Sequence, residues 1–182
     1  MRKLVWIKIL ILIICLIPGN TLVRSEPLPT VSGKAPEPPD VQVVLADTIR
    51  AFSLYSSFLS DCTEKNDALI PLHGSTRAEA LSYLNQGFTP KMSEAIIDEC
   101  TLWNDSLGAL TIVPGDGIPV LTVEDTEEIR LHAANRNKIT LLRKYNNCYT
   151  EGDEYLLLVT MIPDHDAWKI SELSFNCGNE NN

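Results

Sequence analysis

The sequence predicts an α+β domain in which three helices come first and antiparallel strands follow. Apolar residues recur at three- and four-residue steps from about residue 41 to 100. After about residue 109 they alternate with polar residues or form short β-branched runs, and turn residues separate these runs. Helices followed by strands favour helices on one face of a sheet. We therefore expect three N-terminal helices packed on a curved antiparallel sheet of four to six strands.

The first expected helix runs from Asp40, a suitable N-cap, to near Cys62. One face of this helix is apolar, and it consists of Val44, Leu45, Thr48, Ala51, Phe52, Tyr55, Phe58 and Leu59. The aromatic residues in this stripe could form a ligand wall, but an apolar helical face more commonly packs in the core. We therefore expect this face to be buried.

A loop around 71–74 precedes the second expected helix, which ends near Asn85. Ser75 or Thr76 caps this helix, and Glu79, three residues after Thr76, completes a capping-box pattern. Gly87 then fits the helix stop.

The third expected helix follows at once. Thr89 is its cap, and Pro90 occupies the first helical position, where proline is tolerated. The apolar residues of this helix continue to about Cys100. Both Cys62 and Cys100 are thus expected near helix ends.

Strand patterns fill the second half of the chain. Two short β-rich runs, 109–113 and 119–123, flank the turn cluster Pro114-Gly115-Asp116-Gly117. Four longer strand patterns follow, over 129–133, 138–145, 155–162 and 168–175. A hairpin turn at 163–166 separates the last two.

The first 25 residues predict a secretory signal peptide. Arg2, Lys3 and Lys8 form a basic start, and Ile9–Ile17 is an apolar run too short to span a bilayer. Residues 26–40 contain five prolines, which favours an extended or disordered tether. The expected organisation is a signal peptide over 1–25, a tether over 26–40, one domain over 41–177 and a tail over 178–182.

The net charge excludes some classes of partner. The chain carries 24 acidic and 15 basic residues, a formal charge of -9, which argues against binding nucleic acid or anionic lipid. Cleavage after Ser25 would remove four basic residues and no acidic one, leaving 11 basic residues and a charge of -13. Such a charge steers a protein towards partners with a basic surface. We expect no stable membrane insertion after cleavage.

Four cysteines would remain after cleavage: Cys62, Cys100, Cys148 and Cys177. An even number in an exported chain favours disulfides, and three pairings are possible. We favour Cys62 with Cys100, because both are expected near the ends of packed helices, and Cys148 with Cys177, because both flank the sheet. No pair has the two-residue spacing of a zinc site, so we expect no metal and no cofactor.

No catalytic motif stands out. The three histidines lie in different elements, there is no Gly-x-Ser-x-Gly elbow and no Gly-rich phosphate loop, and the cysteines are better explained as bridges. The acidic residues around His165 and over 124–128 fit a solvated hairpin tip and a solvated edge better than metal sites. The sequence therefore favours a binding protein over an enzyme.

Two features are similar to a known fold. They are the step from Tyr83-Leu84 to Phe88-Thr89-Pro90, and the final strand pair, Leu156–Met161 followed by Ala167-Trp168-Lys169-Ile170. With the order of elements, they resemble the NTF2-like (cystatin-like) α+β fold of small exported bacterial proteins. This resemblance implies a small-ligand carrier or enzyme, with a pocket between the first helix and the sheet, lined from Tyr55, Tyr155 or Trp168.

A second resemblance rests on Gly115-Asp116, which lies between the helical and strand halves and is followed by acidic residues over 124–128. This layout looks like the secreted IseA-type inhibitors of cell-wall DL-endopeptidases, which plug the catalytic cleft with an acidic Gly-Asp loop. It implies a partner-binding loop at Gly115, Asp116 and Gly117. The same four residues, Pro-Gly-Asp-Gly, also suit a plain tight turn.

Overall fold

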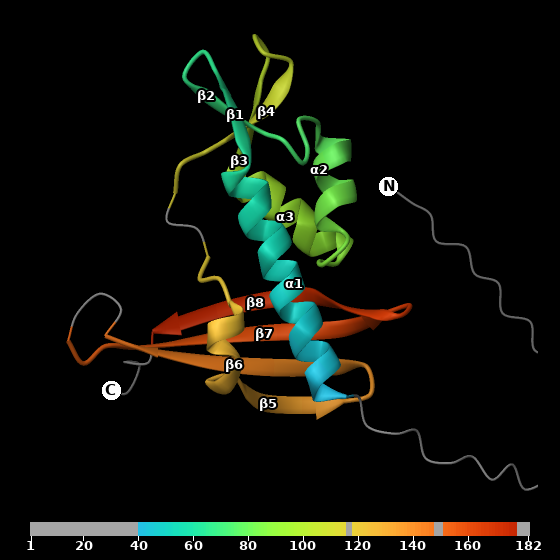
Figure 1. Ribbon diagram of the computed structural model, residues 1–182, viewed down its shortest axis with the longest axis vertical. Helices are drawn as coiled ribbons and strands as arrows, with labels where there is room; N and C mark the ends of the chain where they lie inside the picture. The colour runs from blue at the N-terminus through green and yellow to red at the C-terminus, as the bar shows by residue number, and fades with distance from the viewer. Residues whose placement is uncertain (1–39, 116–117, 148–150, 178–182) are drawn as a thin grey trace, which may run out of the picture. The chain divides into compact units, whose positions relative to one another are not determined.

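The structure is a computed structural model that describes residues 40–115, 118–147 and 151–177, all within one compact unit. It is an α+β protein, as expected: three α-helices precede a four-stranded antiparallel sheet in the described part of the chain (Figure 1). Two small hairpins, which the sequence predicted only in part, also occur: one follows α1 in the chain and the other follows α3.

The first helix, α1 (Val41–Ser60), begins where the sequence predicted. The Asp40 carboxylate accepts a hydrogen bond from the Gln42 N–H at 2.9 Å and so caps the helix. The apolar face is buried as expected, through Val44, Leu45, Thr48, Ala51, Phe52, Tyr55 and Phe58.

The second helix, α2 (Arg77–Leu84), has the predicted capping box. Thr76 Oγ1 accepts the Glu79 N–H at 3.3 Å, and the Glu79 carboxylate accepts the Thr76 N–H at 3.0 Å. Helix α3 (Pro90–Cys100) follows with Pro90 in its first turn. The Thr89 side chain makes no capping bond, but the Thr89 N–H donates to the Ile170 carbonyl at 2.9 Å.

The main sheet has the order β5-β6-β7-β8, and every neighbouring pair is antiparallel. The strands match the four longer predicted patterns: β5 (Arg130–Asn135), β6 (Lys138–Asn146), β7 (Glu154–Asp164) and β8 (Ala167–Cys177). Asp164 pairs with Ala167, so the predicted β7–β8 turn is tight, and His165 there has a φ of 56°.

Two short hairpins lie beyond the sheet, at the C-terminal end of α1 (Figure 1). They are β1 (Cys62–Lys65) with β2 (Ala68–Pro71), and β3 (Thr101–Asn104) with β4 (Ala109–Ile112). The sequence predicted a loop where β2 ends and a strand at β4. The β1–β2 turn consists of Asn66 and Asp67, whose φ values are 53° and 59°, a geometry that Asn and Asp tolerate.

One predicted strand is absent from the described residues. Residues 119–122 belong to no strand, and Val123 begins a short 3-10 helix, η1 (Val123–Glu127). Leu121 is nevertheless buried in the core, which explains why the run is apolar.

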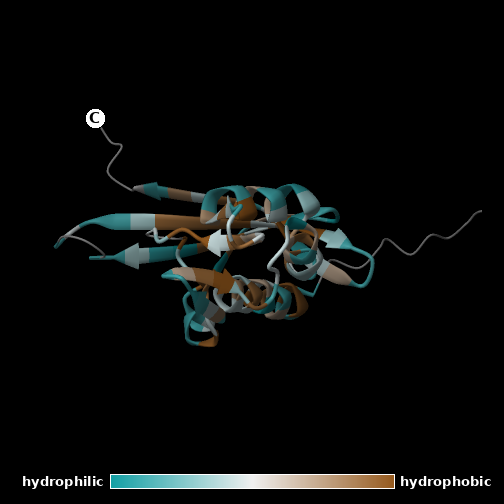
Figure 2. Ribbon diagram, turned by 90° about the horizontal axis from the view of Figure 1, so that it is seen from above, coloured by the Kyte–Doolittle hydropathy of each residue, from teal (hydrophilic) through white to brown (hydrophobic). Residues whose placement is uncertain are grey.

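The core lies between the helices and the inner face of the sheet. Residues from α1, α2, α3 and the sheet form one buried cluster, which includes Phe52, Phe88, Leu141, Val159 and Ile170. In Figure 2 the strands are hydrophilic at the ends on the left of the view and include hydrophobic stretches farther along. The interface between α1 and the sheet is therefore filled with side chains.

We predict that Gly87→Ala lowers the free energy of unfolding by about 1–3 kcal/mol, because it overpacks a close contact. A Cβ at Gly87 would lie 2.7 Å from the Ala51 Cα, and Ala51 is fully buried. Gly115→Ala is the matched control, since a Cβ at Gly115 meets nothing within 4 Å. Urea denaturation of both variants measures the difference, and equal stability would contradict this packing argument.

Candidate functional site

The predicted partner-binding loop lies in the segment that connects β4 to η1, residues 113–122, which we call the connecting segment (Figure 1). Gly115 is exposed, and open space surrounds its Cα. Asp116 and Gly117 lie outside the described residues. The structure therefore describes both flanks of the predicted loop but only one of its three residues.

Two hydrogen bonds attach the flanks of this loop to the helices. Before the loop, the Val113 N–H donates to the Cys100 carbonyl at the end of α3, at 2.9 Å. After the loop, the Ile118 N–H donates to the Tyr55 hydroxyl on α1, at 3.3 Å. Farther along, Leu121 is only 1% exposed and holds the segment in the core. The loop is thus fixed on both sides.

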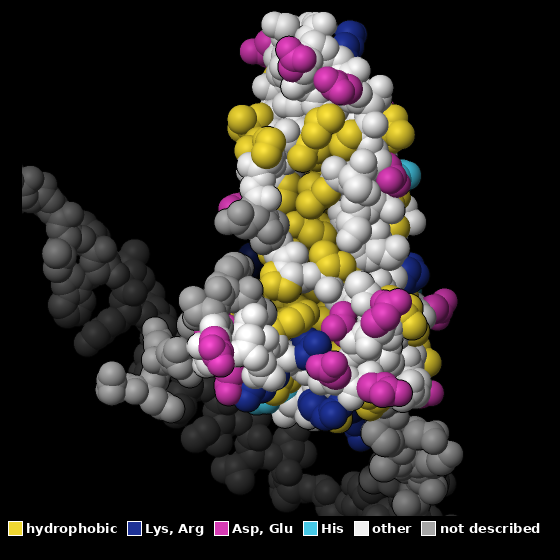
Figure 3. Space-filling view, turned by 60° about the vertical axis from the view of Figure 1, so that its left-hand side comes forward, with side chains coloured by type: hydrophobic (Ala, Val, Ile, Leu, Met, Phe, Trp, Pro, Cys, Tyr) yellow, Lys and Arg dark blue, Asp and Glu magenta, His cyan; other side chains and the backbone are white. Residues whose placement is uncertain are grey.

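A cleft of about 550 Å³ lies between the connecting segment, α1 and α3, and we call it the Tyr55 cleft. Its lining is mostly apolar, with one carboxylate, one phenol and one thiol: Tyr55, Leu59, Glu99, Cys100, Ile112, Val113, Pro114, Gly115 and Ile118. Figure 3 shows hydrophobic side chains gathered along the middle of one face, between the hairpins and the sheet. The cleft therefore offers an apolar surface directly beside the loop.

The sequence assigned Tyr55 to the core, and the structure places it both in the core and at the cleft. Tyr55 is 2% exposed, and its hydroxyl lies 4.0 Å from the Cys100 Sγ. Burial, together with a smaller contribution from Cys100, raises the pKa of Tyr55 to about 12 against the opposing effect of the Ile118 N–H. Burial also raises the pKa of the Cys100 thiol. Both groups remain protonated at neutral pH, so neither is an activated nucleophile.

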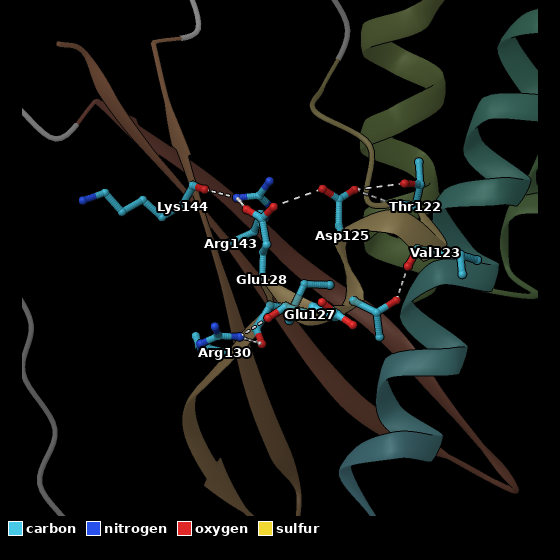
Figure 4. Close-up of polar contacts among 10 residues, drawn as sticks. Thr122, Val123, Asp125, Glu127, Glu128, Arg130, Arg143 and Lys144 are labelled. Carbon is cyan, nitrogen blue, oxygen red and sulfur yellow. Dashed lines mark hydrogen bonds and ion pairs between the residues drawn. The ribbon is translucent and has the colours of Figure 1, made fainter.

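The far end of the connecting segment is clamped to the sheet through Arg143 on β6 (Figure 4). The Arg143 Nε donates to Asp125 at 3.2 Å, and its Nη1 donates to Glu128 at 2.6 Å. The guanidinium also lies over the Tyr145 ring, 4.5 Å from its centroid. Arg143 is 13% and Asp125 17% exposed, so this contact is largely screened from water.

Asp125 contacts Thr122 as well as Arg143. Its carboxylate accepts the Thr122 N–H at 2.9 Å and the Thr122 hydroxyl at 3.1 Å. Burial raises the pKa of Asp125, but the Thr122 N–H and Arg143 outweigh burial, and the net pKa is below its usual value. Asp125 is therefore ionised and holds η1 against β6.

The predicted bridge between Cys62 and Cys100 is wrong in this structure, because both residues are free thiols. The Cys62 thiol donates to the Leu59 carbonyl at 3.3 Å, whereas the Cys100 thiol faces Tyr55. Lying near a helix end therefore did not bring the two sulfur atoms together. Cys148 and the side chain of Cys177 lie outside the described part of the chain, so that pairing stays a prediction.

The three histidines lie in separate places. His73 pairs with Asp61 at 2.9 Å and stacks on Tyr83, His165 contacts Asp164 at 2.8 Å, and His132 lies on β5. Among the described residues, no three His, Cys, Asp or Glu side chains come together as metal ligands would.

The two other residues proposed for a ligand pocket are not part of the Tyr55 cleft. Tyr155 stacks on Phe175, with ring centroids 5.2 Å apart. Trp168 donates its backbone N–H to the Asp47 carboxylate at 2.8 Å. The expected pocket between α1 and the sheet is occupied by core side chains instead, whereas the Tyr55 cleft lies beside the connecting segment.

Comparisons with known proteins found no match to a family model, a curated protein or a solved structure. Within the described residues, no helix has the length and apolar character needed to cross a membrane.

We predict that Arg143→Gln lowers the free energy of unfolding by about 2 kcal/mol, because it leaves the largely buried Asp125 carboxylate without its charged donor. Arg77→Gln is the matched control. It breaks another Arg–Asp pair, Arg77 with Asp98, but both side chains there are about half exposed or more, and we expect almost no change. Chemical denaturation of the two variants makes the comparison, and equal effects would remove Arg143 as the clamp.

We predict that one tyrosine ionises at about pH 12 in the folded protein and that Tyr55→Phe removes this titration step. Folding raises this pKa from 10.0, so the stabilising effect of the neutral phenol is complete below pH 10 and is lost as the pH rises towards 12. Phenolate absorbance against pH measures the step. An unchanged absorbance difference above pH 11 in the variant would contradict the assignment.

Proposed function

We propose that this chain is an exported, non-catalytic binding module and that the loop beginning at Pro114, with the Tyr55 cleft beside it, meets a protein partner. The observation that carries the proposal is the attachment of the loop on both sides, to Cys100 and to Tyr55. Flanks that are already held in place lose less conformational entropy on binding, so more of the contact energy appears as affinity.

The chemistry of this surface suits a partner with a basic face. The described lining of the cleft offers apolar walls and the carboxylate of Glu99, which together suit a long side chain with a cationic end. The acidic charge of the exported chain would speed the encounter with such a partner. The pKa values of Tyr55 and Cys100 are raised, so neither group supplies an activated nucleophile at neutral pH.

The most concrete version of this proposal is an inhibitor of a cell-wall hydrolase, such as a DL-endopeptidase. It rests on the resemblance of Gly115-Asp116 to the IseA-type inhibitory loop. The loop would offer carboxylate and carbonyl acceptors to donors that normally hold the substrate. The position of Gly115, exposed between two attached flanks, is compatible with insertion into a cleft.

An alternative function is an NTF2-like small-ligand carrier. One observation favours it: the Tyr55 cleft, about 550 Å³ and mainly apolar, falls in the size range of small-molecule sites. In this version the ligand would lie beside the connecting segment, since the space between α1 and the sheet is filled. This alternative also proposes that the three helices and the sheet have the NTF2-like arrangement.

We predict that Asp116→Ala weakens binding to a purified cell-wall DL-endopeptidase at least 100-fold, because the loop loses its carboxylate. Tyr55→Phe removes the acceptor of the Ile118 N–H, and we expect about a tenfold weaker affinity, which corresponds to about 1.4 kcal/mol. Isothermal titration calorimetry measures both affinities, and thermal unfolding checks that Asp116→Ala keeps the melting temperature.

Asp166→Ala is the control for this experiment. Asp166 is an exposed aspartate in the tight turn between β7 and β8, so its removal changes the charge equally without touching the loop. Unchanged affinity of Asp116→Ala would remove the inhibitor version. The carrier would be favoured if the protein does not bind the hydrolase but binds an apolar fluorescent dye saturably. Ile112→Trp should then block binding of the dye.

A further inference from the structure

The two edges of the main sheet differ. The β8 edge is partly covered, because the Thr89 N–H donates to the Ile170 carbonyl and the Ile170 N–H donates to the Gly87 carbonyl, each at 2.9 Å. The other edge is β5, and all six of its residues are exposed. Within the described residues, the backbone of β5 pairs only with β6.

A free edge is a template for another strand. In an antiparallel pair, every second residue turns its N–H and C=O groups away from the neighbouring strand. On β5 these groups face outward, at the lower edge of the sheet in Figure 1. An extended peptide can pair with them, as in the recognition of peptides by strand addition.

The charge along β5 and β6 is opposite to that of the whole chain, although the acidic η1 comes directly before β5. Residues 129–150 contain five Lys or Arg and no Asp or Glu, although the chain has 24 acidic residues. On β6, Arg143 and Lys144 are paired, with Asp125 and Glu128 and with Glu154 respectively. Their charge is therefore largely neutralised.

The cations of β5 and its turn have no such partners. Arg130 and Arg136 make no ion pair with any residue that the structure describes. The Arg130 guanidinium donates to the backbone carbonyls of Glu127 and Ile129, which fixes its position but leaves its charge unbalanced. The free edge is thus flanked by Arg130 at one end and Arg136 at the other.

We propose that β5 is a docking strand for an extended acidic segment of a partner protein, which adds a strand to the sheet and places carboxylates beside Arg130 and Arg136. Two copies of this chain would bring like charges together at β5. This repulsion disfavours self-association but does not oppose an acidic peptide. This surface is separate from the Tyr55 cleft and takes a partner of the opposite charge.

The experiment uses the full chain and a blocked ten-residue peptide of alternating threonine and glutamate. We expect binding that slows hydrogen exchange of the outward-facing β5 amides at least tenfold and that weakens with added salt. The same peptide with lysine in place of glutamate should not bind. A glutamate peptide N-methylated at alternate residues tests whether backbone pairing is required, and it should lose at least tenfold in affinity.

Arg136→Glu should weaken binding of the glutamate peptide about tenfold, and Arg130→Glu with Arg136→Glu should weaken it more. The single variant is decisive if the double variant fails to fold, since Arg136 lies in an exposed turn. Lys91→Glu, an exposed site on α3, makes the same charge change and should have no effect. Three results would each overturn the proposal. The N-methylated peptide could bind as tightly as the glutamate peptide, linear polyphosphate could bind as tightly as that peptide, or dimerisation alone could protect the β5 amides.

Discussion

The burial of one face of α1 is the interaction on which the rest of the structure depends. Val44, Ala51 and Phe52 on this face belong to the core that the helices share with the sheet, and Phe58 extends that core towards the hairpins. A fully buried Phe or Leu contributes about 1.5–3 kcal/mol, so a helix with this many buried side chains is a firm support. The same face carries Tyr55, whose hydroxyl holds the connecting segment. Helix α1 therefore contributes both to the core and to the candidate site.

Charge separates the molecule into surfaces with different uses. The chain is acidic overall, yet the stretch 129–150 has only basic charges, and β5 and β6 within it form the free edge of the sheet and the strand beside it. The buried part of that stretch is neutralised through Arg143, because a largely buried charge without a partner is costly. The exposed Arg130 of β5 has no such partner, and water solvates it. Burial thus explains why Arg143 is paired, whereas Lys144 on the same strand is about half exposed and is paired with Glu154 all the same.

Much of the fold was predictable because its signals are local. The capping box of Thr76 and Glu79 and the alternation in β6 each act over a few residues, and the structure confirms them. The β1–β2 hairpin was not predicted, because four-residue strands show too little alternation. The run 119–123 looked like a strand because Leu121 must be apolar to reach the core, although no strand pairs with it. The Cys62–Cys100 bridge failed because positions near helix ends do not determine which way the side chains point.

The sequence by itself determined the α+β class, the boundaries of α1 and α2, the four strands of the main sheet and the acidic charge. These properties follow from periodicity, capping and composition, which involve near neighbours or simple counts. Only the tertiary structure decided that Tyr55 reaches Ile118, that Arg143 meets Asp125, and that β5 is the uncovered edge. The first two contacts join residues 63 and 18 positions apart. Such contacts depend on how whole elements pack, and no local pattern in the chain encodes that packing.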